Sequence, residues 1–416
     1  MIYHFYYFFC LDVLKLFELT IILLYSFLKL GTGECMATIE KSQNDSRQAT
    51  NPLFNNNKLK LGTFGTNVSG GCSITKADGA LEINWPNVSS ISKIADDIGF
   101  EALVPVARWR GFGGETDFNA HCFETYTWAA GLGGQTDQAA VFSTSHVPTM
   151  HPILAAKQAT TIDHITNGRF ALNIVVGWYQ PEIEMFGNKL MEHDTRYDYA
   201  DEWIEVMKLL WTEEEEFTYE GKYFQVPKGF AQPKPIQAPF PALMNAGGSE
   251  RGKHFGAKHC DMMFQAITSS DASVLKAEIE SVREMARTGY GREIQVWTNS
   301  YVVHGDTEDD AKAYYNYYVN EMGDWKAADN LIRVLGINSK MVGKEAFEGL
   351  KSQFMAGYCG YPLIGTTEMI VDGLAKLSDL GYNGTLLSWV DYEAGLKRFN
   401  AEVMPLLEQK GLRAPS

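Results

Sequence analysis

The chain has 416 residues, of which 45% are hydrophobic and 21% are charged, a composition that is ordinary for a globular protein with a large core. Its formal net charge of −15 argues against nucleic-acid binding, because neutralising phosphates requires clustered Lys and Arg. The six cysteines lie far apart and form no CxxC pair, which disfavours a zinc site or a disulfide scaffold and favours reduced thiols in the cytoplasm.

The N-terminal region differs in composition from the rest of the chain. Residues 1–35 are rich in Phe, Tyr, Leu and Ile, but the uncharged run at residues 19–28 has only half of the ~20 residues that a membrane-spanning helix needs. Neither a basic start nor a small-residue cleavage site indicates a signal peptide. We expect residues 1–57 to be an extension outside the catalytic domain, with a true start at Met36, or a membrane anchor as the alternative, and a disordered polar stretch after Met36. Residues 58–416 are expected to form one folded domain.

Alternating strands and helices are predicted along the rest of the chain. Apolar and β-branched runs predict eight strands, at residues 59–65, 100–107, 138–147, 169–178, 242–248, 261–267, 294–305 and 384–391. Apolar residues at helical spacing predict helices at residues 85–98, 151–165, 196–211, 271–288, 306–322 and 366–380. Alternation implies parallel pairing and an α/β fold, and eight strands suffice to close a TIM (β/α)8 barrel. An open, doubly wound sheet is the rival architecture, although no GxGxxG follows a strand.

Two insertions interrupt this alternation. Residues 217–226 predict a β-hairpin that turns around Gly221. Residues 323–364 are expected to form a long, irregular excursion. Insertions after the C-terminal ends of barrel strands are where such folds build substrate pockets, so we place both insertions at that face.

Polar residues near predicted strand ends are candidates for either structure or function. Asn173 lies in an apolar strand, where an unpaired amide is costly, so it bonds a neighbouring loop or a ligand. Asp163, His164 and Arg169 surround a turn at the opposite face, which favours structural hydrogen bonds. No HExxH motif or similar histidine pair is present, so no metal site is expected.

An anion site is predicted at two helix starts. Arg196 in a first helical turn opposes the helix dipole, which favours an anion beside it and the following Tyr197. The alternative is that both residues only decorate a helix that Asp194 or Thr195 caps. Ser249 follows two glycines and is compatible with both helix capping and anion binding.

A series of short motifs resembles the bacterial luciferase-like family of flavin-dependent monooxygenases, in its alkanesulfonate, dimethylsulfone and pyrimidine monooxygenase branch. In chain order the motifs are Arg110-Gly111-Phe112-Gly113-Gly114, Thr161-Ile162-Asp163, Asn167-Gly168-Arg169-Phe170, Asn173-Ile174-Val175, Gly177-Trp178, Arg196-Tyr197-Asp198-Tyr199, Ala246-Gly247-Gly248-Ser249 and Leu363-Ile364-Gly365-Thr366. The resemblance runs from about Lys60 to about Glu408 and implies a (β/α)8 barrel with FMN at the C-terminal ends of its strands.

The resemblance also implies which residues contact FMN. They are Ala107, Arg108, Asn173, Glu182, Arg196, Tyr197 and Ser249. Asn173 suits the amide-like edge of the isoalloxazine ring, whereas Arg196, Tyr197 and Ser249 suit the phosphate. Candidates for the substrate pocket are Phe112, Trp178, Tyr301 and His304. No residue is assigned as an acid or base, because the flavin carries the chemistry.

The implied function is an FMNH2-dependent monooxygenase that inserts one oxygen atom of O2 into a small pyrimidine-, sulfone- or alkanesulfonate-like substrate. It implies a cytoplasmic, two-component system with a separate NAD(P)H-flavin reductase, and a homodimer or homotetramer. Asn299 and Tyr301 stand where alkanesulfonate monooxygenases carry Arg and His, which removes the cation expected to hold a sulfonate. Two alternatives use the same barrel: an F420-dependent oxidoreductase and a flavin-binding protein without catalysis.

Overall fold

A computed structural model describes residues 45–267, 269–337 and 344–415 of the chain. The barrel belongs to a compact unit that runs from Ser46 to Ser416, so it begins ahead of the boundary expected at residue 58. The expectations for residues 1–44, including the start at Met36 and the alternative of a membrane anchor, lie outside the described residues. Within the described ranges, no helix combines the length and apolarity required to cross a bilayer.

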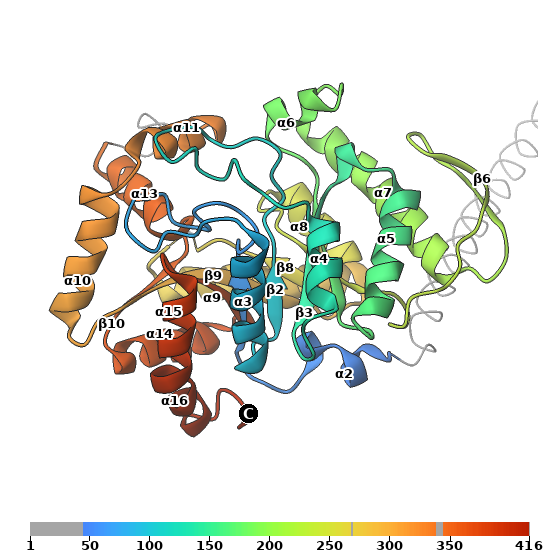
Figure 1. Cartoon of the computed structure of the whole chain (residues 1–416). Coiled ribbons are helices and arrows are strands. Elements are labelled where there is room, and N and C mark those ends of the chain that lie inside the picture. The colour runs from blue at the N-terminus through green and yellow to red at the C-terminus, as the bar shows by residue number, and fades with distance from the viewer. Residues whose placement is uncertain (1–44, 268, 338–343, 416) are drawn as a thin grey trace, which may run out of the picture. The chain divides into compact units, whose positions relative to one another are not determined.

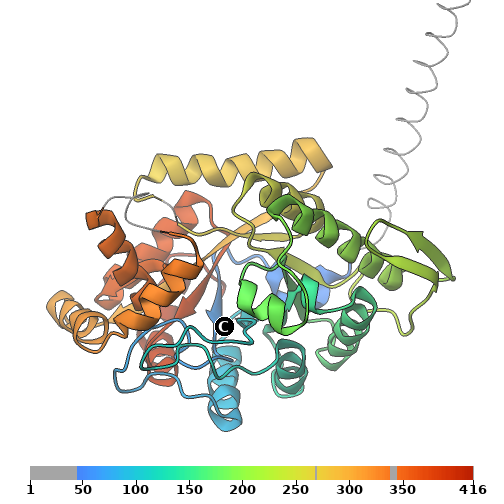
Figure 2. The same cartoon turned by 90° about the horizontal axis from the view of Figure 1, so that it is seen from above.

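Eight parallel strands close into a barrel at the centre of this unit, and helices surround them (Figures 1 and 2). The strands are β1 (Lys60–Phe64), β2 (Ala102–Val104), β3 (Ala140–His146), β4 (Phe170–Val175), β7 (Ala242–Asn245), β8 (Met262–Phe264), β9 (Gln295–His304) and β11 (Gly384–Ser388). Neighbours pair in this order, and β11 returns to β1 to complete the ring. The predicted TIM barrel is confirmed, and the open, doubly wound sheet is wrong. Each strand lies within its predicted range and is shorter than that range.

Interior packing explains why these runs form strands. Inward-facing side chains of several strands make one apolar cluster that includes Phe142, Met244 and Leu386. Gly62 lies where β1 and β2 pack closely, since a Cβ atom there would lie 2.6 Å from the Ala102 carbonyl oxygen. Both faces of the strands are covered, which is why the sequence shows continuous apolar runs instead of alternation.

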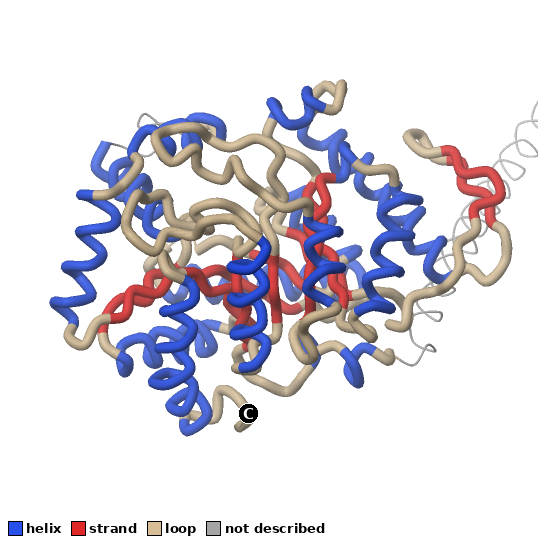
Figure 3. Tube along the Cα trace, viewed as in Figure 1, coloured by secondary structure: helices blue, strands red, loops and turns tan. Residues whose placement is uncertain are grey.

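Helices cover the outside of the barrel, as Figure 3 shows in blue around the red strands. They are α3 (Trp85–Asp97), α4 (Thr125–Gly133), α5 (Pro152–Ile165), α7 (His193–Thr212), α8 (Glu250–His259), α9 (Ala272–Tyr290), α10 (Glu308–Asn316), α14 (Thr367–Leu380), α15 (Tyr392–Arg398) and α16 (Met404–Gln409). The six predicted helices are confirmed, the fifth as α10 continued by the π-helical turn Tyr317–Glu321 (η3). A second π-helical turn, Phe399–Val403 (η4), joins α15 to α16.

The second insertion is more regular than expected. Residues 323–364 were predicted to be irregular, and this is wrong, because they contain α11 (Trp325–Val334), α13 (Lys344–Gly357) and strand β10 (Tyr361–Gly365). Strand β10 pairs with the outer half of β9, from Ser300 to His304, beyond the part of β9 that pairs with β8. The first insertion forms the predicted hairpin, with strands β5 (Phe217–Glu220) and β6 (Gln225–Gly229). Strand β7 and then helix α8 follow the hairpin in the chain.

The floor of the barrel is built from both ends of the described unit. Helix α2 (Arg47–Thr50) and the 3-10 turn Pro52–Phe54 (η1) place Leu53 in the interior cluster. The predicted structural bonds at this face are confirmed: Asp163 accepts from the Ile236 and Gln237 amides, at 2.7 and 3.0 Å, and Arg169 donates to the Thr136 and Ala139 carbonyls. This face therefore serves stability, and the opposite face is left for function.

Candidate active site

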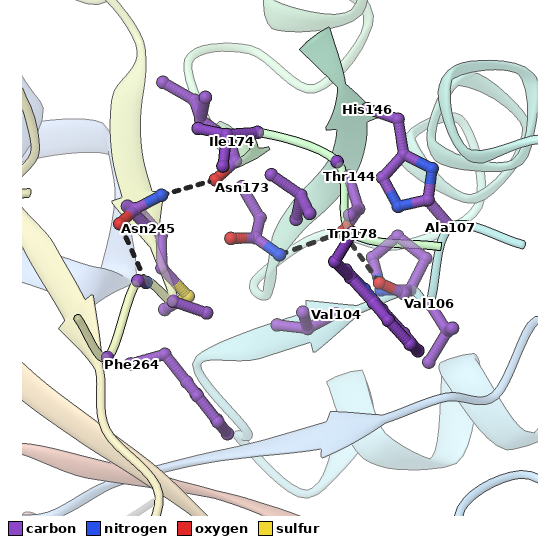
Figure 4. Close-up of a pocket in the computed structure, with 18 of the residues that line it drawn as sticks. Val104, Val106, Ala107, Thr144, His146, Asn173, Ile174, Trp178, Asn245 and Phe264 are labelled. Atoms are coloured by element: carbon purple, nitrogen blue, oxygen red, sulfur yellow. Dashed lines mark hydrogen bonds between the residues drawn. The ribbon is translucent and has the colours of Figure 1, made fainter. Parts of the chain in front are cut away.

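A cavity of about 430 Å³ opens at the C-terminal ends of the strands. Figure 4 shows side chains from β2, β3, β4, β7 and β8 converging on it. Its walls are mainly apolar, from residues such as Phe64, Val104, Ile174, Met244, Phe264 and Leu386. The size and the few polar groups among apolar walls are typical of a site for a small molecule or cofactor.

Asn173 presents an unpartnered acceptor to this cavity. Its Nδ2 donates to Thr144 Oγ1 at 3.3 Å, and that hydroxyl donates to the Pro105 carbonyl at 2.7 Å (Figure 4). Its Oδ1 is buried and has no hydrogen-bond partner in the described part of the chain. A structural role therefore explains only the Nδ2 group of Asn173. Its Oδ1 atom can accept a hydrogen bond from a ligand N–H.

Arg196, Tyr197, Gly247, Gly248 and Ser249 line one end of the cavity, which we call the anion corner. Arg196 Nη1 donates to the Gly177 carbonyl, and its Nε has no partner among the described residues. Ser249 caps α8 by accepting from the Gly252 amide at 3.1 Å. Amides at the start of a ten-residue helix, a guanidinium and two hydroxyls form a donor set that suits an anion.

The start of α7 differs from the prediction. Glu192 caps this helix by accepting from the Asp194 and Thr195 amides, so neither of those two residues is the cap. Arg196 and Tyr197 consequently lie within the first turns and not at the helix start.

Close packing holds Tyr197 in the anion corner. A Cβ atom at either Gly247 or Gly252 would lie 2.5 Å from the Tyr197 hydroxyl oxygen, so the hydroxyl occupies a slot that only two glycines leave open. Burial raises the pKa of Tyr197, and a hydrogen bond with Ser249 opposes this shift. The hydroxyl is thus a neutral donor that is fixed beside the start of α8.

Arg108, which lines the cavity, forms a buried ion pair with Glu182, which does not. Arg108 Nη1 lies 3.2 Å from both carboxylate oxygens, and Glu182 also accepts from the Trp109 and Arg110 amides at 2.6 and 3.1 Å. The guanidinium stacks near the rings of Phe112 and Trp178, with its Cζ 4.9 and 5.3 Å from the centroids. Glu182 thereby holds the loop after β2 against helix α6 (Gln180–Met185).

The cavity brings together most but not all of the predicted site residues. Ala107, Arg108, Asn173, Trp178, Arg196, Tyr197 and Ser249 line it. Glu182 does not, because its carboxylate is enclosed by Arg108 and the amides that follow. Phe112 is not among the lining residues, although its ring stacks against that of Trp178 with the centroids 6.3 Å apart.

Two predicted pocket residues of β9 lie elsewhere. Tyr301 is buried against Tyr315 in the cluster formed with α10, α11 and α13. His304 Nε2 bonds Thr367 Oγ1 at 2.9 Å and lies 3.3 Å from Glu402. Neither residue lines the cavity, because β10 and α13 fill the space beside β9.

Sequence reasoning missed five polar residues of the cavity, which include Thr144 and His193. His146 ends β3, Asn245 ends β7, and Tyr358 follows α13. Burial, with the charge of Arg108 adding to it, lowers the pKa of His146 to about 3, so its ring is neutral. His146 and Asn245 stand at strand ends, and this position could have predicted them as site residues. Tyr358 reaches the cavity only through the second insertion, so no strand-end pattern indicates it. In the described ranges, no three His, Cys, Asp or Glu side chains gather as metal ligands.

A family model for luciferase-like monooxygenases matches residues 60–384, which span the barrel from β1 into β11. The chain belongs to the luciferase-like monooxygenase family. The resemblance predicted from the sequence is therefore confirmed.

Named relatives cover nearly the same part of the chain. An FMNH2-dependent dimethylsulfone monooxygenase of Pseudomonas fluorescens is 27% identical over 368 residues, covering 86% of this chain and 97% of that protein. A pyrimidine monooxygenase, RutA, of Acinetobacter baylyi is 29% identical over 365 residues, covering 85% and 95%. Among solved structures, long-chain alkane monooxygenase LadA superposes with a TM-score of 0.74 at 22% identity, covering 86% of this chain and 93% of that one, which supports the fold.

Proposed function

We propose that this protein is an FMNH2-dependent monooxygenase that oxidises a small, uncharged organic molecule. The observation that carries the proposal is the anion corner at one end of an apolar cavity whose wall holds an unpartnered amide acceptor. FMN has the matching parts, a phosphate at one end and a flat ring with amide-like edges at the other. The dimethylsulfone monooxygenases among the relatives, which are named as FMNH2-dependent, support the same choice.

The residues present fit this cofactor. Arg196, Tyr197, Ser249 and the amides at the start of α8 would hold the phosphate, because they supply charged and neutral donors at one place. Asn173 Oδ1 would accept from an N–H at the ring edge, which satisfies a buried oxygen that otherwise costs about 1–3 kcal/mol. Ala107 and Arg108 would form the wall along the ring, and Glu182 acts by holding Arg108 in place.

When bound, reduced FMN supplies the electrons that activate O2. The chain's own contribution is binding, orientation and exclusion of water. Apolar side chains such as Val106, Trp178 and Phe264 enclose the cavity and keep the reacting groups away from bulk water. His146 is neutral at physiological pH and offers a hydrogen-bonding ring without adding a charge.

The charges around the cavity favour an uncharged substrate. Among the described lining residues, Arg108 is paired with Glu182 and His193 lies 2.7 Å from Asp194. Arg196 is assigned to the phosphate. A sulfonate would therefore enter a cavity without a remaining cation, which is unfavourable in an apolar site. A sulfone or a pyrimidine, as in the names of the relatives, needs only neutral hydrogen bonds.

In the proposed reaction, a separate NAD(P)H-flavin reductase is the partner that supplies reduced FMN to this chain. We test it by incubating the purified protein with FMN, NADH, a generic reductase and isotope-labelled O2. Dimethylsulfone, uracil and an alkanesulfonate are offered in parallel, and products are analysed by mass spectrometry. We expect label in a product of an uncharged substrate and none from the sulfonate.

Three outcomes would overturn parts of the proposal. Labelled product from the sulfonate alone would refute the uncharged substrate class. Quenching of F420 fluorescence without binding of FMN would favour the F420-dependent oxidoreductase. Tight FMN binding with no labelled product across a broad screen would favour a flavin-binding protein without catalysis.

A further inference from the structure

Arg251, in the first turn of α8, reaches across to α7. Its Nη2 lies 3.1 Å from Asp198 Oδ1 and also bonds Asp201 Oδ2. Its guanidinium carbon lies 5.5 Å from the ring centroid of Tyr197, close enough for a cation–π contact. One side chain thus contacts three residues within a single stretch of α7.

A second set of contacts fixes the same two helices further along. His259 Nε2 bonds Asp201 Oδ1 at 2.7 Å, and Lys258 Nζ lies 3.6 Å from the same carboxylate. Asp201 is therefore held by both ends of α8, and the helices cannot slide without breaking charge-assisted bonds.

The position of α7 relative to α8 decides the shape of the anion corner, because each helix supplies part of it. Tyr197 comes from α7, whereas Ser249 caps α8. The Tyr197 hydroxyl enters the slot between Gly247 and Gly252, where a small shift would displace it. Arg251 lies against the ring of Tyr197 and pairs with the carboxylates of Asp198 and Asp201 on the same helix.

We propose that Arg251 is a positioning residue for the phosphate of FMN, which locks Tyr197 in the anion corner and neutralises two carboxylates next to it. This inference rests on the proposed function, in that it takes FMN as the ligand. Arg251 is not itself assigned as a phosphate ligand, since its guanidinium is occupied by Asp198 and Asp201. Its effect should be confined to ligands that carry the phosphate.

The test compares binding of FMN and riboflavin, which lacks the phosphate, by fluorescence quenching of each flavin. We expect Arg251→Gln to weaken FMN binding about tenfold, equivalent to about 1.4 kcal/mol, and to leave riboflavin binding nearly unchanged. The loss should be larger at low ionic strength, because the uncovered Asp198 and Asp201 then repel the phosphate most strongly. Arg251→Lys retains the charge but not the planar fork, so an intermediate loss is expected.

Arg287→Gln is the matched control, because Arg287 forms comparable ion pairs with Glu280, Glu284 and Glu293 on the exposed face of α9. Circular dichroism and melting temperature check that each variant folds, and Arg251→Lys keeps the test decisive if Arg251→Gln does not. Equal losses for FMN and riboflavin, or no loss, would overturn the role of Arg251. If the unaltered protein binds FMN no better than riboflavin, the phosphate site fails, and the proposed function fails with it.

Discussion

At the scale of single residues, the anion corner depends on two glycines that have no side chain, Gly247 and Gly252. A Cβ atom added to either Gly247 or Gly252 would lie 2.8 Å from backbone atoms of the other, which is closer than van der Waals contact allows, and 2.5 Å from the Tyr197 hydroxyl oxygen. Gly248, between Gly247 and Ser249, has no heavy atom within 4 Å of an added Cβ. Adjacent glycines therefore have opposite tolerance for substitution.

This contrast gives a paired prediction. Gly247→Ala should displace Tyr197 and weaken FMN binding, with a packing cost of about 1–3 kcal/mol, because the backbone of Gly252 cannot move away. Gly248→Ala should leave FMN affinity and melting temperature close to those of the unaltered protein. Flavin fluorescence titration and thermal melts measure both. Equal tolerance of the two substitutions would contradict the packing described here.

The buried Arg108–Glu182 pair gives a second prediction at this scale. Glu182→Gln leaves the Arg108 charge buried without its counter-ion and should lower the free energy of unfolding by about 3–5 kcal/mol. Glu115→Gln removes the partner of Lys76 in an exposed pair and should change it by less than about 1 kcal/mol. Urea denaturation of both variants measures the difference, and similar values would show that the Glu182 carboxylate is replaceable.

Which site residues can be predicted from sequence follows from how each reaches the cavity. Asn173, Arg196, Tyr197 and Ser249 stand near strand ends or in the first turns of the helices that follow, where parallel barrels place ligands, and the motifs around them are local. Tyr301 and His304 occupy an equivalent strand end but are covered by β10 and α13. That cover comes from residues more than one element away, so no local pattern reveals it.

At the scale of elements, several of the unpredicted ones lack a clear periodicity, although α11 (Trp325–Val334) has buried residues at helical spacing. Helix α4 has apolar or small residues on all sides, and α8 contains Gly252 and Gly256, which lower helix propensity. Strand β10 carries Pro362, which is tolerated because it lies at the edge of β9 and not within the closed ring. In each case tertiary packing outweighs the local preference of the sequence.

Two buried histidines on different elements predict acid sensitivity. Burial lowers the pKa of His146 on β3 and of His259 on α8 to about 3, the first helped by Arg108 and the second opposed by its bond to Asp201. The unfolded chain titrates near pH 6.5, so between about pH 6.5 and 3 it binds protons that the folded protein excludes. The contribution of these two histidines to the free energy of unfolding is therefore fully present above pH 6.5. It is lost as the pH falls toward 3.

Urea denaturation at pH 7 and pH 5 tests this sign. We expect the unfolding free energy to be lower at pH 5, and His146→Gln to reduce the difference by about 1–2 kcal/mol. His121→Gln, at an exposed position, should leave the difference unchanged. A larger difference in the His146 variant would mean that the folded protein favours the charged ring.

At the scale of the whole folded unit, the barrel is closed at the N-terminal ends of its strands and open at their C-terminal ends. Leu53 from the turn after α2 enters the interior cluster beside Met262 and Trp297, and its carbonyl accepts from Gln295 Nε2 at 2.8 Å. Residues 46–57, the described part ahead of β1, thus pack onto the barrel core, although their polar composition indicated a disordered segment. Composition failed here because one apolar residue and a few buried bonds, such as that of Asn51 to Gln237, suffice to anchor it.

Replacing that anchor should be costly. Leu53→Ala is expected to lower the free energy of unfolding by about 2–5 kcal/mol, through lost burial and the cavity it leaves. Leu154→Ala, on the exposed side of α5, should have little effect. Equilibrium denaturation compares the two, and equal small effects would place residues 46–57 outside the cooperative core.

The last residues of the chain also lie on the floor, where Arg413 Nη1 bonds Glu101 at 2.7 Å and the Ala414 amide bonds Asn57. The cavity opens at the other end of the strands. An affinity tag, a fluorophore or a surface tether appended after Arg413 therefore projects from the side opposite the entrance, and a protein immobilised through it would still present its open mouth to flavin and substrate. Fusing the reductase to this end would instead require a linker long enough to pass around the full height of the barrel.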